Sequence, residues 1–287
     1  MESIYLWMVF TKAFSQKHLL LIGRFVEGTE YFCLCTAASY ALCIIAYLTC
    51  ALNYPLIDQK LNLMDRAMGF DWLKFFHFCW TQPIHIILKI AYDSLFSQLA
   101  FFAAWFSFFS RKDRLYEIFW IFIITLIATS LLSGFFPASG PASALGVEAL
   151  YNNNFKQIFL DMSLIRAGIN PDFSTHGMGG IVTFPSFHTV SAIIFMYGFR
   201  KSGLIGRIIF MLNIVMLLSI PAGGDHYLMD MLAGAAGAIS SIAVVRFINS
   251  RSLSNVALYD FFLKPAIRLV RATEGKEARA QINIIKQ

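Results

Sequence analysis

The chain has 287 residues, of which 57% are hydrophobic, 16% are aromatic and only 14% are charged. Because an ordinary soluble domain carries about 25% charged residues, this composition excludes a typical soluble fold and indicates a protein of the lipid bilayer. The net charge of +6 does not indicate nucleic-acid binding, since Lys and Arg form short clusters between apolar runs and not one basic face.

Six apolar runs are long enough to cross the hydrocarbon core of a bilayer, which takes about 17 to 25 helical residues. They lie at residues 30–53, 84–110, 115–136, 184–200, 204–222 and 226–248. The mixed stretch from 54 to 83 predicts short interfacial helices, and the Gly-, Pro- and Asn-rich stretch from 137 to 183 predicts a long connector. The predicted fold is an all-α integral membrane protein, a six-transmembrane-helix bundle with interfacial helices in the outer connectors.

Positive charges divide unevenly between the two ends of these spans. Seventeen of the 23 Lys and Arg residues fall on the side that holds both termini, and six fall on the other. Because cytoplasmic loops are enriched in Lys and Arg, we expect cytoplasmic termini, as in a protein of the bacterial inner membrane. The expected division is a cytoplasmic segment at 1–28, a membrane catalytic domain at 29–248 and a basic amphipathic cytoplasmic tail at 249–287.

Histidines lie where the fourth and sixth spans begin, and the predicted orientation puts both beginnings at the outer face. His188 follows Pro185 and Ser186, and Pro185 suits the first position of a helix. His226 lies four residues before Asp230, a spacing that puts both on one helical face and lets the carboxylate fix the imidazole tautomer. Helix amino termini also attract phosphate. A carboxylate inside an apolar span is costly, which indicates a functional site.

Two motifs resemble those of the type 2 phosphatidic acid phosphatase superfamily and, within it, the branch related to inositol phosphorylceramide synthases. The segment GIVTFPSFHT at 180–189 is similar to the superfamily's Pro-Ser-x-His motif, and GDHYLMDMLAG at 224–234 is similar to its His-x-x-x-Asp motif. Weaker similarity extends from Tyr54 to about Phe247. The resemblance implies a membrane enzyme that acts on a phospholipid or lipid phosphate and needs no cofactor or metal ion.

The resemblance also implies catalytic roles by position. His226 matches the nucleophile that forms a phosphohistidine, Asp230 its orienting carboxylate, and His188 the acid that protonates the leaving group. A phosphoryl or headgroup acceptor completes the reaction: water makes the enzyme a phosphatase, and an alcohol makes it a phosphotransferase. Because the motif residues are the same for both, the acceptor remains open.

Other residues are expected to bind the substrate. The resemblance implies this role for Arg166, Ser186, Tyr227 and Gly224. Phe159 stands where the superfamily usually has a Lys. Ile220 stands where it usually has a phosphate-binding Arg, so that Arg has no counterpart here. Lys156 and His176 in the outer connector are candidate replacements.

Two other classes of function remain open. A small-solute or proton-coupled transporter could use the intramembrane Lys89 and Asp93, together with Asp230 and the histidines, as an ion path. No pair of broken helices recurs in matching halves of the sequence, which disfavours a transporter. A non-catalytic scaffold that kept the fold is the third class. The sequence specifies neither the lipid nor the oligomeric state.

Overall fold

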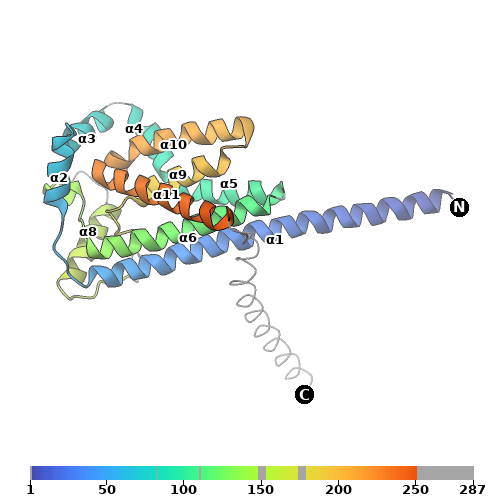
Figure 1. The fold of residues 1–287 in the computed structure, drawn as a ribbon, viewed down its shortest axis with the longest axis horizontal. Coiled ribbons are helices and arrows are strands. Elements are labelled where there is room, and N and C mark those ends of the chain that lie inside the picture. Colours follow the sequence, from blue (N-terminus) through green and yellow to red (C-terminus); the bar gives the residue numbers. More distant parts are fainter. Residues whose placement is uncertain (1, 82, 110, 148–152, 174–178, 251–287) are drawn as a thin grey trace, which may run out of the picture.

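The computed structural model describes residues 2–81, 83–109, 111–147, 153–173 and 179–250 (Figure 1). Within these ranges all regular secondary structure is helical, as expected, and there is no strand. The helices are α1 (Glu2–Cys50), α2 (Asp58–Ala67), α3 (Trp72–Thr81), α4 (Ile84–Asp93), α5 (Leu95–Phe108), α6 (Lys112–Phe135), α7 (Pro141–Ala144), α8 (Asn153–Arg166), α9 (Phe187–Phe199), α10 (Gly203–Gly223) and α11 (Leu228–Ser250).

Four helices are long and apolar enough to cross a membrane: α1 from His18 onward, α6, α10 and α11. Helices α4 and α5 pass the same test only as a pair, which bends by 52° at its break. Helix α9 has 13 residues and is about 20 Å long, which is shorter than a hydrocarbon core of about 30 Å. The described residues therefore contain four or five candidate spans, and the expected count of six is not confirmed.

The expected span over 84–110 is broken at Ser94 into α4 and α5, which pass the length and hydropathy test only together. The hydroxyl of Ser94 donates to the carbonyl of Ala91 at 2.7 Å, and Nε2 of Gln98 donates to the Ser94 hydroxyl at 2.9 Å. Such local bonds compete with the regular helical pattern. The Gln98 side chain also accepts a bond from the buried Asn213 of α10 at 2.7 Å, which fixes the bent pair against the bundle.

Helix α1 runs along the bundle and extends far past its end (Figure 1). Within the bundle it packs mainly on α5 and α6, while α9 packs between α10, α11 and α6. The helix continues without a break through residue 28, where the sequence-based division places the end of the cytoplasmic segment. Almost all of the expected tail at 249–287 lies outside the described residues, so the proposed domain division stays a prediction.

Short helices cover the end of the bundle that carries the start of α11, on the left of Figure 1. Helices α2 and α3 confirm that short helices form between 54 and 83. The indole of Trp72 donates to the carbonyl of Pro221 at 2.8 Å, which fastens α3 to α10. The carboxylate of Asp58 accepts bonds from the amides of Ser139 and Gly140 and from the hydroxyl of Tyr227. These bonds hold the connectors over the turn between α10 and α11.

A buried ion pair fastens the opposite end of the bundle. Arg114, near the start of α6, pairs with Glu117 and donates to the carbonyls of Tyr197 and Gly198 at the end of α9. The hydroxyl of Tyr197 donates to Glu117. Because charges buried without partners are costly, this network fixes the position of α9 along α6.

Candidate active site

His226 lies in the turn between α10 and α11, not inside a helix as expected, because α11 begins at Leu228. Asp225 turns the chain just before it, with φ at 54°. The Nδ1 of His226 lies 3.3 Å from Oδ2 of Asp230, which stands in the first turn of α11 and is fully buried. The expected pair of His226 and Asp230 is therefore present. The two residues do not share one helical face, because His226 precedes α11 and Asp230 lies in its first turn.

Carboxylates already occupy the amino terminus of α11. The amide of Tyr227 donates to Oδ2 of Asp230 at 2.8 Å, and Asp65 of α2 accepts from the amides of Leu228 and Met229 at 2.8 and 3.0 Å. Burial raises the pKa of the Asp65 carboxyl, and these two hydrogen bonds act in the opposite direction. Contrary to the expectation that this helix end would bind phosphate, these three amides are not free to do so.

His188 lies in the first turn of α9. The helix starts at Phe187, and Ser186 is its N-cap, with a hydroxyl that accepts from the amide of Thr189 at 3.4 Å. Pro185 precedes the cap and follows a cis peptide bond. The expectation that Pro185 takes the first helical position is therefore wrong, because a serine at the cap satisfies a first-turn amide that would otherwise lack a partner.

The starts of α9 and α11 are packed directly against each other. The amide of Ser186 donates to the carbonyl of Asp230 at 3.0 Å. A Cβ at Gly234 would lie 2.6 Å from the carbonyl oxygen of Ser186, so only glycine permits this approach. Gly234 thus serves close helix packing, and the packing brings His188 and His226 to the same side of the bundle.

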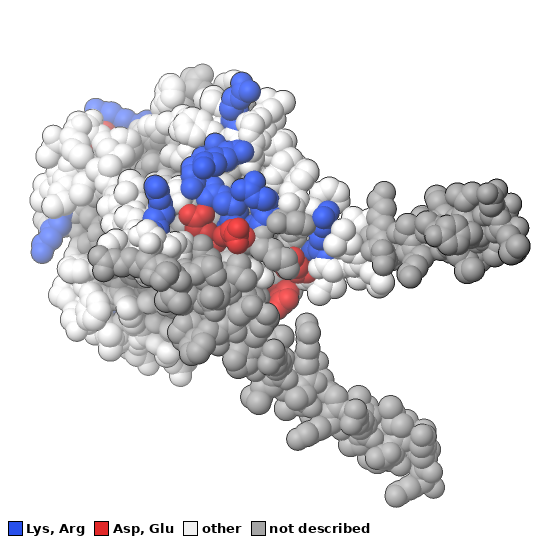
Figure 2. Space-filling view, turned by 45° about the vertical axis from the view of Figure 1, so that its right-hand side comes forward, with Lys and Arg blue, Asp and Glu red and all other residues white. Residues whose placement is uncertain are grey.

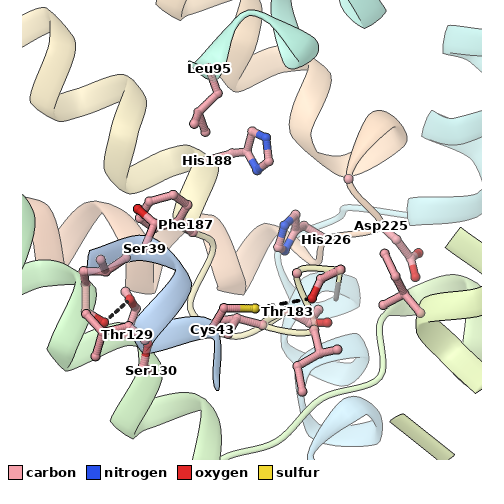
Figure 3. A pocket seen from close by; sticks show the side chains of 18 of the residues that line it. Ser39, Cys43, Leu95, Thr129, Ser130, Thr183, Phe187, His188, Asp225 and His226 are labelled. Carbon is pink, nitrogen blue, oxygen red and sulfur yellow. Dashed lines mark hydrogen bonds between the residues drawn. The ribbon is translucent and has the colours of Figure 1, made fainter. Parts of the chain in front are cut away.

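Both histidines line one cavity of about 460 Å³ (Figure 3). Most of the lining is apolar, with hydroxyl groups on one wall, and no Lys or Arg occurs among the described residues that form it. The apolar members include Leu95, Phe96, Leu126, Ile158, Phe159 and Phe187, and the hydroxyl-bearing members include Thr36, Ser39, Thr129, Ser130, Ser139 and Thr183.

Helix α1 forms one wall of this cavity. The hydroxyls of Thr36 and Ser39 donate to carbonyls of their own helix, which leaves their oxygens as acceptors. The thiol of Cys43 and the hydroxyl of Tyr47 donate to the carbonyl of Gly179 at 3.5 and 3.0 Å. These two bonds attach the segment that leads into α9 to α1, so the wall and the histidine-bearing helix are held together.

Tyr92, on α4, is a residue of the site that the sequence analysis missed. Its ring stacks on the imidazole of His188, with ring centroids 3.9 Å apart and planes inclined by 16°. A Cβ at Gly224 would lie 2.6 Å from the Tyr92 hydroxyl, so the turn before His226 can pack here only because it carries glycine. Tyr92 thereby touches both histidine-bearing segments, and no sequence signal separates it from other aromatic residues of an apolar run.

The residues expected to bind substrate lie in different places. Gly224 lines the cavity, whereas Arg166, Ser186 and Tyr227 are not among its lining residues. Nη2 of Arg166 donates to the carbonyl of Tyr54 at 2.9 Å. Ser186 is fully buried as the α9 cap, and the Tyr227 hydroxyl points to Asp58. Because these three residues do not line the cavity, their binding to phosphate stays a prediction.

The other candidate cations and ion pairs lie away from the cavity lining. Lys156 is exposed on α8, and His176 lies outside the described residues. Lys89 and Asp93 form an ion pair at 2.6 Å, but both side chains are more than half exposed on the surface of α4. Neither residue lines the cavity that holds the histidines.

The sequence profile of the PAP2 superfamily matches residues 59–244, more than half of the chain, and this range contains both histidines and Asp230. The chain belongs to the PAP2 superfamily. Membership supports a phosphatase- or phosphotransferase-type function and confirms the resemblance at the level of the superfamily. Comparison with curated proteins and with solved structures gave no match. The narrower resemblance to inositol phosphorylceramide synthases is not confirmed.

The limits of the PAP2 match divide the cavity into two parts. The histidines, Asp230 and Tyr92 fall inside the matched residues, whereas the wall formed by α1 lies before residue 59. The catalytic candidates thus belong to the part that the superfamily shares, and the wall opposite them belongs to a part that the match does not cover.

Proposed function

We propose that this PAP2 superfamily member is an integral-membrane enzyme that hydrolyses a lipid phosphoester, or transfers its phosphorylated headgroup, through a phosphohistidine intermediate. One observation carries the proposal: His188 and His226 line the same cavity, and Asp230 is positioned at Nδ1 of His226. A nucleophile held by an orienting carboxylate, with a second proton-transfer group beside it, is the arrangement that covalent catalysis requires.

In the first half-reaction the phosphoryl group moves to His226. With Nδ1 turned to Asp230, Nε2 is the nitrogen whose lone pair attacks phosphorus. As the N–P bond forms, the P–O bond to the leaving group breaks, and the leaving oxygen takes a proton from His188. The phosphorylated ring carries a positive charge, which the carboxylate of Asp230 stabilises.

In the second half-reaction the phosphoryl group leaves the enzyme. His188, now neutral, accepts a proton from water or from an alcohol while that oxygen attacks phosphorus. The N–P bond breaks and its electron pair returns to Nε2 of His226. Water yields a phosphatase and an alcohol yields a phosphotransferase, and the same two histidines serve both outcomes.

Donors for the phosphate oxygens are available at the start of α9. The first amides of a helix have no acceptor within the helix, and the helix dipole places partial positive charge there. The amides of Phe187 and His188 are such groups, at the position where the imidazole enters the cavity. We therefore assign the phosphate to this helix end, because the amides of α11 are bonded to Asp65 and Asp230.

The apolar lining supports a lipid as the substrate. A cavity of about 460 Å³ falls within the usual range for small-molecule sites, roughly 300 to 1,000 Å³. It holds the reacting group and the first part of a hydrocarbon chain, not a whole lipid. Contact with apolar side chains of α5, α6 and α8 stabilises that part of the substrate by removing it from water.

The proposal includes a topology of six crossings, in which the bent pair of α4 and α5 is one crossing and α9, with the residues just before it, is another. The uneven distribution of Lys and Arg supports cytoplasmic termini and a site on the periplasmic or lumenal face. The partners are then the membrane itself and a phospholipid or lipid phosphate.

A panel of lipid phosphates offered to the purified protein tests the proposal. We expect release of phosphate or headgroup from at least one lipid, abolished in His226→Ala and in His188→Ala. His77→Ala is the matched control, because this exposed histidine of α3 does not line the cavity. Unimpaired turnover by His226→Ala would remove His226 as the nucleophile and with it the proposed function.

Trapping of the intermediate tests the same mechanism directly. Rapid quenching under alkaline conditions should preserve an acid-labile phosphorylated adduct, and peptide mass spectrometry should assign it to the peptide that contains His226. An adduct on another peptide, or turnover without any adduct in burst-phase experiments, would contradict the covalent mechanism.

A further inference from the structure

A second cavity lies between α1 and α5, on a part of α1 closer to the amino terminus than the histidine cavity. It has a volume of about 440 Å³ and is lined almost entirely by apolar and small side chains, except for one arginine. Its lining includes Arg24, Phe25, Gly28 and Phe32 of α1 and Ala100 and Ala104 of α5. An apolar channel with a cation at one end has the shape and polarity of a phospholipid site.

The position of Arg24 along α1 fits the depth of lipid headgroups. Helix α1 ends at Cys50, beside the end of the bundle that carries the histidines. A hydrocarbon core of about 30 Å spans roughly 20 helical residues, which reaches from Cys50 to about residue 30. Arg24 lies about 9 Å farther along the helix. Its guanidinium is therefore at headgroup level, and the groove runs from there to Phe32, at the edge of the hydrocarbon core.

The guanidinium of Arg24 lacks a protein partner for one of its donors. Nε is buried and has no hydrogen-bond acceptor among the described residues. The guanidinium carbon lies 6.0 Å from the ring centroid of Phe108, which is at the outer limit of a cation–π contact. The hydroxyl of Ser107, which packs against Gly28, is also buried without a partner in the described chain. A buried donor needs an acceptor, and a lipid phosphate supplies one that also carries the opposite charge.

The surroundings of the groove are rich in positive charge. Figure 2 shows Lys and Arg gathered on one face, with a few acidic residues beside them. Exposed cations at this end of the bundle include Arg111, Arg200, Lys201 and Arg207. Glu27 and Glu30 lie on α1 close to Arg24, and Glu27 accepts a bond from Tyr116 at 3.4 Å. The exposed cations at this end of the bundle attract anionic lipid headgroups.

We propose that the groove between α1 and α5 binds one anionic phospholipid from the leaflet that the charge distribution assigns to the cytoplasmic side. The lipid phosphate bonds the guanidinium of Arg24, and one acyl chain lies between Gly28 and Phe32 of α1 and Ala100 to Ala104 of α5. The site is separate from the histidine cavity and does not depend on the proposed reaction. Its role is to hold α1 against α5 in the bilayer.

Native mass spectrometry of the full chain tests this site. The protein is reconstituted into phosphatidylcholine vesicles that contain a minor fraction of phosphatidylglycerol, extracted in mild detergent and examined for retained lipid. We expect one phosphatidylglycerol per chain. Arg24→Gln should weaken its retention about tenfold, the effect of losing one charge-assisted hydrogen bond. Ala104→Phe, which fills the groove from an exposed position, should exclude the lipid with Arg24 intact.

Arg111→Gln is the matched control, since it removes an exposed cation from the same end but not from the groove. Equal loss of lipid in Arg111→Gln and Arg24→Gln would overturn the proposal in favour of surface charge alone. Wild-type retention in both groove variants would overturn it as well. A dimer mass that Ala104→Phe abolishes would assign the groove to a second copy, and increased lipid retention after deletion of residues 251–287 would assign it to the tail.

Discussion

Replacement of Asp230 by Asn isolates the negative charge that the phosphohistidine mechanism requires. Oδ2 of Asp230 accepts from the amide of Tyr227 at 2.8 Å and lies 3.3 Å from Nδ1 of His226. Because the Tyr227 amide demands an acceptor, the Asn carboxamide must place its oxygen at the Oδ2 position. The variant therefore keeps the shape of the site and the tautomer of His226, and it loses only the charge.

The expected magnitude follows from these contacts. A hydrogen bond to a charged group contributes about 1.5–3 kcal/mol, and one between neutral groups about 0.5–1.5 kcal/mol. The difference of about 1–1.5 kcal/mol corresponds to roughly a tenfold lower kcat. Asp230→Ala also removes the bond and should lower kcat roughly a hundredfold. Since the ring becomes positive only as phosphorus is attacked, the loss should fall on kcat and not on KM.

Steady-state kinetics with the best lipid phosphate of the panel measures both constants, and thermal unfolding of each variant checks that the fold survives. The order of activities should be wild type, then Asp230→Asn, then Asp230→Ala. A folded Asp230→Ala protein with wild-type kcat would refute the role of this carboxylate. An increase in KM alone would show that Asp230 acts on substrate binding and not on the nucleophile.

Three further outcomes are expected. Tyr92→Leu should lower kcat about twofold to tenfold, because a stacked ring pair contributes about 0.5–1.5 kcal/mol, while Tyr92→Phe keeps the stacking and should keep the activity; an equal loss in both would assign the effect to the hydroxyl. Burial raises the pKa of Asp65 above its ordinary value of 3.8. Protonated Asp65 therefore stabilises the folded state fully below pH 3.8, and this stabilisation is lost as the pH rises through the raised pKa. As the pH rises over that window, the Tm of the wild type should fall relative to the Tm of Asp65→Asn. Vanadate should inhibit turnover and a chelator should leave it unchanged, and loss of activity with the chelator would contradict the metal-free mechanism.

The apolar runs predict the membrane helices well, but the exact starts and breaks of the helices depend on distant partners. Helix α11 begins at Leu228 because Asp65, more than 160 positions earlier, accepts bonds from its first amides. The bend at Ser94 depends on Gln98, whose side chain is in turn held by Asn213 of α10. Periodicity carries no information about such long-range bonds, so the sequence alone placed both boundaries incorrectly.

Site residues were predictable where their spacing within a motif constrained them. His188 and Asp230 lie in the first turns of their helices and His226 lies just before one, and the packing of the two helix starts brings both histidines to one cavity. Tyr92 had no such motif, because an aromatic residue in an apolar helix is usually a packing residue. Arg166 had weak support from its motif, and the orientation of α8 directs its side chain to the carbonyl of Tyr54.

Under the proposed function, the two parts of the cavity separate chemistry from selection of the substrate. The histidines and Asp230 lie within the residues shared with the PAP2 superfamily, whereas α1 supplies the opposite wall from outside that range. The wall is attached to the segment before α9 through Cys43 and Tyr47. Changes in α1 can therefore alter the shape available to a lipid chain without touching the reacting groups. Because binding far from the reacting atoms also positions them, the same wall affects the rate of a well-fitting substrate.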